Sequence, residues 1–207
     1  MAGAPQGLYE ERSEERRQAA IRSIEEKGVK VVENEMEPTH HRVLENVDAG
    51  LEESIKCGAA LPKRILIDSS HAEALENVRS NPATYSNKKD SITINPRSMF
   101  FQAGMMRSKA RAERLRDIRR FSTDSIMHTI RHELSHCAHW HHDQTSYLLN
   151  DFDKLSEKEL AIVEVSNYAG ENPPEFIAEV RAAFLDGKEF SDDIMEMYDH
   201  YSGGLKR

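Results

Sequence analysis

The sequence contains few of the residues and segments that secreted or membrane-spanning proteins need. Only two of its 207 residues are cysteines, Cys57 and Cys137, so a disulfide framework is excluded and a reducing compartment is the simpler interpretation. No apolar run approaches the length that spans a membrane, and the N-terminus, MAGAPQGLYEERSEERRQAA, lacks the apolar segment of a secretory signal. We therefore expect a soluble protein that is cytoplasmic or delivered without a standard signal peptide.

The chain also lacks an excess of positive charge. Its 28 lysines and arginines are outnumbered by 36 aspartates and glutamates, which gives a formal net charge of −8. This balance argues against a general nucleic-acid-binding protein, and no membrane partner is expected. With 38% apolar and 31% charged residues, the chain is polar but able to fold, and its length suits one sizeable domain.

The hydrophobic pattern predicts a mainly helical α+β domain with a small mixed or antiparallel sheet. Strands are expected at 29–35 and 63–69, with a hairpin at 83–96 that turns at 87–90. Helices are expected at 1–28, 39–57, 105–120, 172–187 and 191–201. Another is expected to begin at Ser70. One more is expected to begin at Ser122 or Thr123 and end at 142, and a further one to begin at a capping box of Ser156 and Glu159 and end at 165. Residues 1–60 are expected to form an N-terminal helical cover or extension, and 61–207 the main domain.

The stretch TIRHELSHCAHWHH at residues 129–142 contains five histidines and one glutamate. Within it, His132, Glu133 and His136 spell H-E-x-x-H. Two histidines four residues apart lie one turn apart on the same helical face, so both rings can reach one metal ion. Glu133 then lies beside the open side of the metal, where it can take a proton from the attacking water. One Zn²⁺ per chain is expected, because imidazole suits zinc and no redox chemistry is implied.

The other histidines and the cysteine of this helix are weaker candidates for metal ligands. His128 lies one turn before His132, but that register places Thr129, which is no base, after its first histidine. Cys137 is expected to be a small core residue. Three more histidines are expected at the solvated C-terminal end of the helix: His139, His141 and His142.

A catalytic zinc usually has three protein ligands, so a third one is needed downstream. Glu175 and Glu179 lie four residues apart on the helix expected at 172–187. Glu175 also fits the third helical position after an Asn172 N-cap, where a capping-box glutamate belongs. Glu179 also fits an ordinary surface carboxylate. Spacing alone leaves both alternatives open.

The two motifs together resemble a known family. HELSH, with a downstream stretch that fits Y-A-x-x-N-P-x-E-F-x-A-E, is similar to zinc metallopeptidases related to the anthrax lethal factor catalytic domain and to the Pro-Pro endopeptidases, a group with toxin- and phage-associated members. The resemblance covers about 85–185 and implies a zincin-like fold. It implies that Glu133 is the general base, that Tyr168 assists at the substrate carbonyl and that Glu179 supports a histidine ligand. It implies three zinc ligands: His132, His136 and Glu175.

The function that this resemblance implies is a zinc-dependent endopeptidase. The alternatives are a non-catalytic zinc-binding module of a phage head or toxin assembly, and a zinc hydrolase of a non-peptide bond. Glu133 and Tyr168 favour catalysis, because a structural zinc site needs neither. A protein or peptide substrate is expected to bind as an extended strand beside the strand that begins at Ser91 and ends at Asn95. The arginine-rich helix 105–120 is a candidate docking site for an acidic partner.

Overall fold

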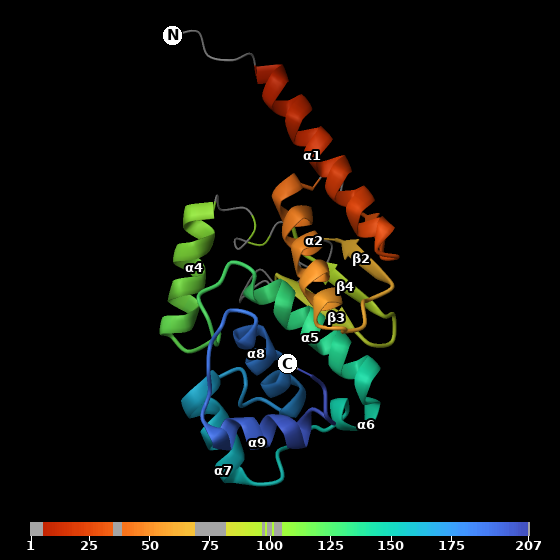
Figure 1. The fold of residues 1–207 in the computed structure, drawn as a ribbon. Coiled ribbons are helices and arrows are strands. Elements are labelled where there is room, and N and C mark those ends of the chain that lie inside the picture. Colours follow the sequence, from red (N-terminus) through yellow and green to blue (C-terminus); the bar gives the residue numbers. More distant parts are fainter. Residues whose placement is uncertain are drawn as a thin grey trace.

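The structure, a computed structural model, describes residues 6–34, 39–68, 82–96, 98, 101 and 105–206. These residues form one α+β domain in which helices pack against one face of a four-stranded mixed sheet (Figure 1). The helix expected to begin at Ser70 lies outside them. The strands are β1 (Lys30–Glu33), β2 (Arg64–Ile67), β3 (Ala83–Ser86) and β4 (Ser91–Ile94). The helices are α1 (Gln6–Glu26), α2 (His41–Lys56), α4 (Met105–Asp117), α5 (His128–His142), α6 (Gln144–Tyr147), α7 (Leu155–Leu160), α8 (Pro173–Phe184) and α9 (Asp192–Tyr201).

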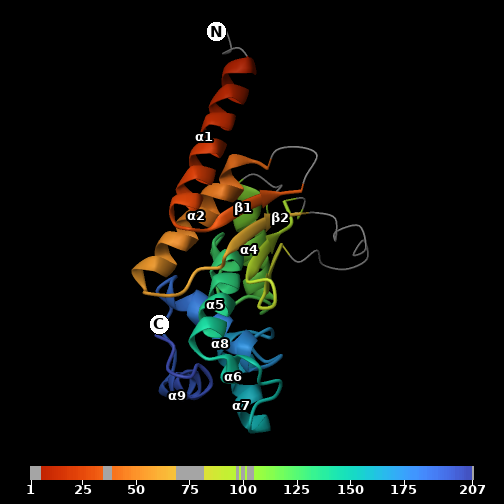
Figure 2. The same cartoon turned by 90° about the vertical axis from the view of Figure 1, so that its right-hand side faces the viewer.

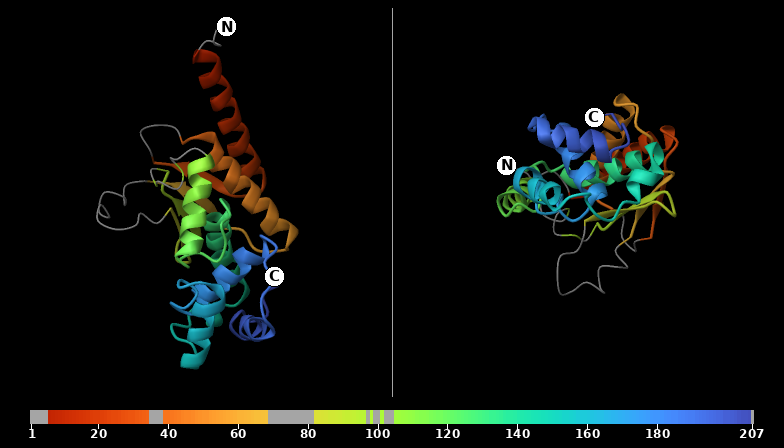
Figure 3. Two further views of the ribbon diagram at one scale, coloured as in Figure 1. Left: turned by 90° about the vertical axis from the view of Figure 1, so that its left-hand side faces the viewer. Right: turned by 90° about the horizontal axis from the view of Figure 1, so that it is seen from below.

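The sheet has the strand order β1-β2-β4-β3, in which β3 is antiparallel to β4 and the other neighbours are parallel. The expected strands and hairpin are confirmed, and residues 87–90 form the turn. Ile65 and Ile67 of β2 lie beside Ile92 and Ile94 of β4, and all four are buried. Helices α2 and α5 cover this face, as the view from below shows (Figure 3, right). The alternating isoleucines of both strands thus point into one core.

The expected substrate-binding strand, β4, is not at the edge of the sheet. β4 is paired with β2 on one side and with β3 on the other, so no strand can be added beside Ser91 to Asn95. That prediction is wrong because the chain brings β2 against β4, which leaves β3 as the edge strand among the described residues. Within this described part of the chain, β3 pairs with β4 alone, and on its other edge the Tyr85 N–H donates to Glu133 of α5.

The described part of residues 1–60 contributes to the same core as the later elements. Ala20 and Ile24 of α1 and Leu44 and Leu51 of α2 belong to one buried cluster with the isoleucines of the sheet. Figure 2 shows α1 and α2 running along one side of the sheet, whose first strand is β1. The N-terminal region is therefore built into the domain, although the first turns of α1 extend beyond the other elements (Figure 1). None of the described helices has the length and apolar character needed to cross a membrane.

α5 begins later than its sequence suggests. Its first residue is His128, and the N-cap residue Met127 makes no side-chain capping bond. Ser122 and Thr123, the expected caps, lie in the loop before the helix. The backbone N–H of Ser122 donates to Glu179 Oε2 at 2.7 Å. The Ser122 hydroxyl, the group that would cap a helix, donates instead to the backbone carbonyl of Glu179 at 2.9 Å.

α8 begins where its sequence predicts. The side chain of Asn172 caps it by accepting the N–H of Glu175 at 3.0 Å, and Pro173 is its first residue. Gly187 follows its end with a φ of +78°, a left-handed conformation that glycine adopts without strain. This start determines which residues of α8 face α5, because side chains three and four positions apart share one helical face.

α7 begins two residues before the expected position. Its first residue is Leu155, and the N-cap residue Lys154 donates its backbone N–H to Glu157 Oε2 at 3.2 Å. The predicted capping box of Ser156 and Glu159 is therefore wrong, because Glu157 occupies the third helical position. The helix continues through a π-helical turn, Ala161–Val165, so its expected end is confirmed.

The arginine-rich segment forms α4, as expected. Some of its positive charge is already paired within the chain: Arg116 contacts Asp117 and Asp124, and Arg120, beyond the helix, contacts Glu171. Such exposed pairs are weak and can exchange partners. The acidic partner expected at 105–120 remains a prediction.

Candidate active site

Two helices bring the motif residues together. α5 carries His132 and His136 one turn apart, and α8, which packs beside α5 (Figure 1), carries Glu175 in its first turn. His132 Nε2 lies 3.0 Å from His136 Nε2 and 3.0 Å from Glu175 Oε2. His136 Nε2 lies 3.3 Å from the same carboxylate oxygen. The three expected ligands therefore form a closed triangle of donor atoms.

The size of this ligand triangle fits a tetrahedral zinc ion. Ligand atoms about 2.0–2.2 Å from a tetrahedral zinc lie about 3.3–3.6 Å from one another. The donor atoms of His132, His136 and Glu175 are separated by 3.0, 3.0 and 3.3 Å, at or just below this range. Two imidazole nitrogens and one carboxylate oxygen are also donors that zinc prefers, and together they leave one tetrahedral position for water.

The charges around the triangle also suit a cation. Burial favours the neutral form of Glu175, yet contacts with His132 and His136 hold the pKa of its carboxyl far below the usual range. Burial likewise opposes a charge on His132, but Glu175 and Glu179 raise its pKa well above the ordinary histidine value. The pKa of Glu179 is held well below its usual range by its histidine contacts, although burial acts the other way. Both carboxylates are therefore ionised at neutral pH and attract positive charge to the ring nitrogens.

Glu179 is fully buried, so it is not the surface carboxylate that spacing allowed. Its Oε2 accepts the N–H of Ser122 at 2.7 Å and the hydroxyl of Ser166 at 3.0 Å. Its Oε1 lies 2.9 Å from His132 Nδ1, although off the direction of an ideal ring N–H bond. This is the ring nitrogen that does not face the ligand triangle. The contact therefore suits a residue that orients His132, as the family resemblance implies.

Glu175 combines the two roles that spacing left open. Its backbone N–H donates to the side chain of Asn172, as at a capping-box position. Its carboxylate lies 3.0 Å from His132 Nε2 and 3.3 Å from His136 Nε2. Its side chain is 18% exposed, against 0% for Glu179. Capping of the backbone thus sets the helical register in which the third candidate ligand meets the histidines.

His128, which its register seemed to exclude, belongs to the surroundings of the site. Its Nε2 lies 2.9 Å from Glu179 Oε1, so His128 and His132 share one carboxylate oxygen. His128 is almost fully buried, and its ring packs on Phe121. The spacing of four residues between His128 and His132 indicated that the two rings share a helical face. It could not show that Glu179 of α8 contacts both of them.

A cleft of about 270 Å³ opens beside the ligand triangle, and its walls include Glu133, His136 and Glu175. Glu133 Oε2 accepts the backbone N–H of Tyr85, in the border strand β3, at 2.7 Å. The base expected from the motif therefore lies between the ligand triangle and the outer edge of β3.

Two tyrosines line the same cleft. Tyr168, expected from the resemblance, stacks on His132 with ring centres 5.3 Å apart, and the Arg120 guanidinium lies 4.1 Å from its ring centre. Tyr147 packs edge-on against the His136 ring at 5.9 Å. Burial raises the pKa of both tyrosines, so each hydroxyl remains a proton donor at neutral pH. The sequence gives no indication of a role for Tyr147, because this residue ends the four-residue helix α6, which is too short to show a periodic pattern.

The last histidines of α5 have two different environments. His141 and His142 are exposed, as expected, whereas His139 is buried and hydrogen-bonded to Ser146 Oγ at 2.8 Å. The prediction for His139 is wrong because α6 packs back onto that side of α5. Burial lowers the pKa of His139 to about 4, so the ring is neutral at pH 7. Cys137 is buried, as expected.

Within the described part of the chain, three groups of side chains have a spacing that suits a metal ion. The first is the ligand triangle. The second consists of His128, His132 and Glu179 and shares His132 with the first. The third lies on another face of α5 and consists of Asp90, Cys137 and His141.

No protein-family model matches the chain, and no curated protein matches it either. The resemblance to the lethal factor group therefore depends on the H-E-x-x-H motif and on the stretch from Tyr168 to Glu179. The roles that it implies for these residues remain predictions, and the geometry of the cleft is the independent support for them.

Proposed function

We propose that the protein is a zinc-dependent endopeptidase with a zincin-like fold. One observation carries the proposal, the convergence of three donor atoms within 3.0–3.3 Å: His132 Nε2, His136 Nε2 and Glu175 Oε2. Glu133 and Tyr168 line the cleft beside these atoms. A structural zinc site would use four protein ligands and would need neither residue. The donor set therefore supports a hydrolytic centre over a non-catalytic assembly module.

Each residue of the cleft has a separate role in the proposed hydrolysis. A zinc ion held here would supply the Lewis acidity that brings the pKa of water toward neutrality. Glu133 takes the proton of the attacking water on Oε1, because its Oε2 is held by Tyr85, and passes the proton to the leaving amine. Tyr168 donates a hydrogen bond to the carbonyl oxygen as negative charge develops, a contribution of about 3 kcal/mol. Glu179 keeps the His132 ring in position from Nδ1.

The outer edge of β3 is the place where we propose that the peptide binds. The carbonyl of Pro82 accepts the N–H of Asn95 after β4, so the alternate residues Ala83 and Tyr85 turn their backbone groups outward. The N–H of Tyr85 is held by Glu133, so the Tyr85 carbonyl would be the group that pairs with an added strand. A peptide paired there passes directly beside Glu133, which supports a peptide substrate over other hydrolysable bonds.

A peptide-library digest tests this function. We expect the zinc-loaded protein to release new peptide N-termini, a chelator to abolish the release and added zinc to restore it. Glu133→Gln should keep the metal and lose about 10²- to 10⁴-fold in rate, the range for a general base. Glu159→Gln, at an exposed position on α7, is the matched control and should cleave normally. A zinc-loaded wild type that cleaves no peptide, or a Glu133→Gln variant with full activity, would refute the proposal.

A further inference from the structure

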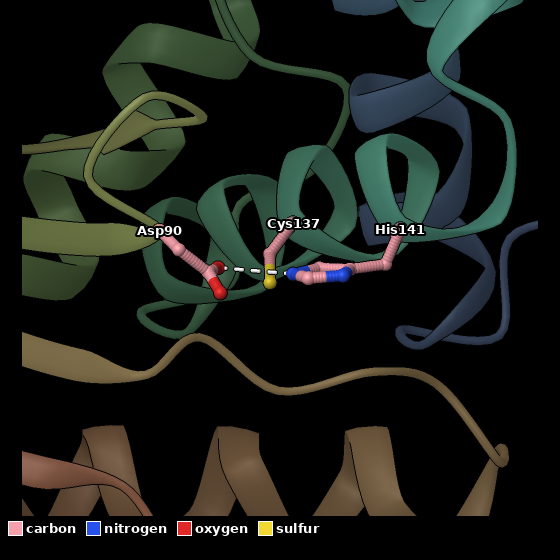
Figure 4. Close-up of side chains that lie close together, drawn as sticks. All are labelled: Asp90, Cys137 and His141. Carbon is pink, nitrogen blue, oxygen red and sulfur yellow. Dashed lines mark hydrogen bonds and ion pairs between the residues drawn. The ribbon is translucent and has the colours of Figure 1, made fainter.

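A second group of potential metal ligands lies on another face of the motif helix. It consists of Asp90, Cys137 and His141, whose donor atoms all lie within 4.8 Å of one another. His141 Nε2 lies 3.0 Å from Asp90 Oδ1. Figure 4 shows the Asp90 carboxylate and the His141 ring pointing toward each other, with the Cys137 sulfur beside the line that joins them. None of these residues takes part in the proposed peptide hydrolysis.

Helical spacing and the hairpin turn explain why the three side chains meet. Cys137 and His141 lie four residues apart on α5, so they share a face, as two metal-binding histidines of such a motif do. Asp90 is the last residue of the turn between β3 and β4 and has a φ of +46°, which an aspartate adopts more readily than most residues. The Tyr85 hydroxyl lies 3.3 Å from Asp90 Oδ1 and helps to hold the carboxylate over α5.

We propose that Asp90, Cys137 and His141 form a second Zn²⁺ site. A thiolate, an imidazole and a carboxylate are the three ligand types that protein zinc sites use, and water would complete an open, exchangeable site rather than the closed four-ligand kind of purely structural sites. Zinc suits this set better than calcium or magnesium, which prefer oxygen donors. The thiolate and the carboxylate balance the two positive charges of the ion. The thiol proton leaves to solvent when the zinc–sulfur bond forms.

The depth of the cluster allows both binding and entry. Cys137 is completely buried, whereas the side chains of Asp90 and His141 are 11% and 34% exposed. Because Cys137 is fully buried, an ion entering from the side of His141 would reach the sulfur only after the partly exposed imidazole moves aside. Lys63 Nζ lies 3.6 Å from Asp90 Oδ2, but the lysine side chain is 76% exposed and its ammonium can move into solvent when a cation arrives.

The second site would fasten the hairpin to the motif helix. Asp90 belongs to the hairpin turn, and Cys137 and His141 belong to α5, so one ion would join the two elements. The same hairpin carries Tyr85, whose N–H holds Glu133. Metal binding at this second site would therefore stabilise the position of β3 beside the cleft, while its ligands are separate from those of the ligand triangle.

Cobalt(II) substitution tests the second site with a signal of its own. A cysteine thiolate bound to cobalt(II) gives a charge-transfer absorption band in the near ultraviolet that histidine and carboxylate ligands do not give. We expect the wild-type protein to bind two equivalents of cobalt or zinc and to show this band. Cys137→Ala and His141→Gln should each bind one equivalent less, and Cys137→Ala should lose the band.

Matched variants separate this site from the proposed active site. Cys57→Ala removes the other cysteine, and His142→Gln removes the neighbouring exposed histidine; both should bind two equivalents and keep the band. His136→Ala should lose the ion of the ligand triangle and keep the band. A wild-type protein without the thiolate band would overturn the second site, and so would two equivalents bound by both Cys137→Ala and His141→Gln. Neither result would affect the proposed peptidase.

Discussion

Replacing Glu179 by glutamine keeps the volume of the side chain and removes its charge, so it isolates the work of one buried carboxylate. Its two oxygens receive four contacts, from the backbone N–H of Ser122, the hydroxyl of Ser166 and the rings of His128 and His132. The glutamine amide has one accepting oxygen and one donating nitrogen. Whichever way the amide turns, two of the four contacts meet a donor in place of an acceptor.

The cheaper orientation places the amide nitrogen toward the histidines. His128 can answer by changing its tautomer, because its Nδ1 lies 3.4 Å from Thr123 Oγ1. His132 cannot change its tautomer while zinc is bound, because the proton would move to Nε2, the nitrogen that binds the ion. Its Nδ1–H therefore loses its acceptor. We expect zinc affinity to fall about 10- to 100-fold, the usual effect of losing the support of a ligand. In the metal-free protein the contact with Glu175 favours a His132 ring protonated on both nitrogens, so its Nδ1–H still lacks an acceptor. A buried donor left unpaired costs about 1–3 kcal/mol, which should appear as a loss of stability of the metal-free protein.

Two measurements on Glu179→Gln and Glu175→Gln test this reasoning. Zinc affinity is measured by competition with a chelator, and stability by urea unfolding of the metal-free protein. Glu175→Gln should lose most of its zinc affinity and less stability than Glu179→Gln, because the Glu175 side chain is 18% exposed at the cleft. If Glu179→Gln bound zinc as tightly as the wild type and unfolded at the same urea concentration, the role assigned to Glu179 would be wrong. If the two variants exchanged severities, Glu179 would be the ligand.

Three further predictions concern other parts of the structure. Tyr168→Phe should keep the zinc and the KM and lose about 10²-fold in kcat, as for one oxyanion donor; full turnover on a cleaved peptide would exclude the role. The pKa of His139 is lowered to about 4 by burial, below the value of about 6.5 in the unfolded chain, so the unfolded state binds the proton first as the pH falls. This histidine should therefore remove about 3 kcal/mol of stability between pH 6.5 and 4, and His139→Asn should show a shallower loss in urea unfolding over that range; an unchanged pH dependence would contradict it. Gly50→Ala would place a methyl carbon 2.8 Å from Ile130 Cγ2, so we expect a destabilisation of about 1–3 kcal/mol, and an unchanged melting temperature would mean that α2 and α5 lie further apart.

The candidate site could be predicted as far as it depends on local helical geometry. His132 and His136 share a face because of their spacing, and the residues Asn172 and Pro173 predict where α8 begins. Both statements need only the residues of one helix and its cap. The two isoleucine-rich strands were visible for the same reason, since alternation is a property of the strand itself.

The remaining features depend on partners far away in the sequence. Ser122 has the right type and position for an N-cap, but its hydroxyl is bonded to the backbone carbonyl of Glu179 across the core. His139 looks like a solvated helix end until α6 packs against it. The sequence of a four-residue strand does not determine which strand it pairs with. The sequence therefore could not show that β2 pairs with β4 or that β3 is the edge strand among the described residues. These choices are made by tertiary packing, which overrides local preference.

The measurement that tests the central claim most directly is anomalous diffraction at the zinc absorption edge from crystals of the zinc-loaded protein. The account predicts a zinc peak within about 2.0–2.2 Å of His132 Nε2, His136 Nε2 and a carboxylate oxygen of Glu175, with Glu179 behind the His132 ring. A fully loaded crystal without a zinc peak between these three side chains would contradict it.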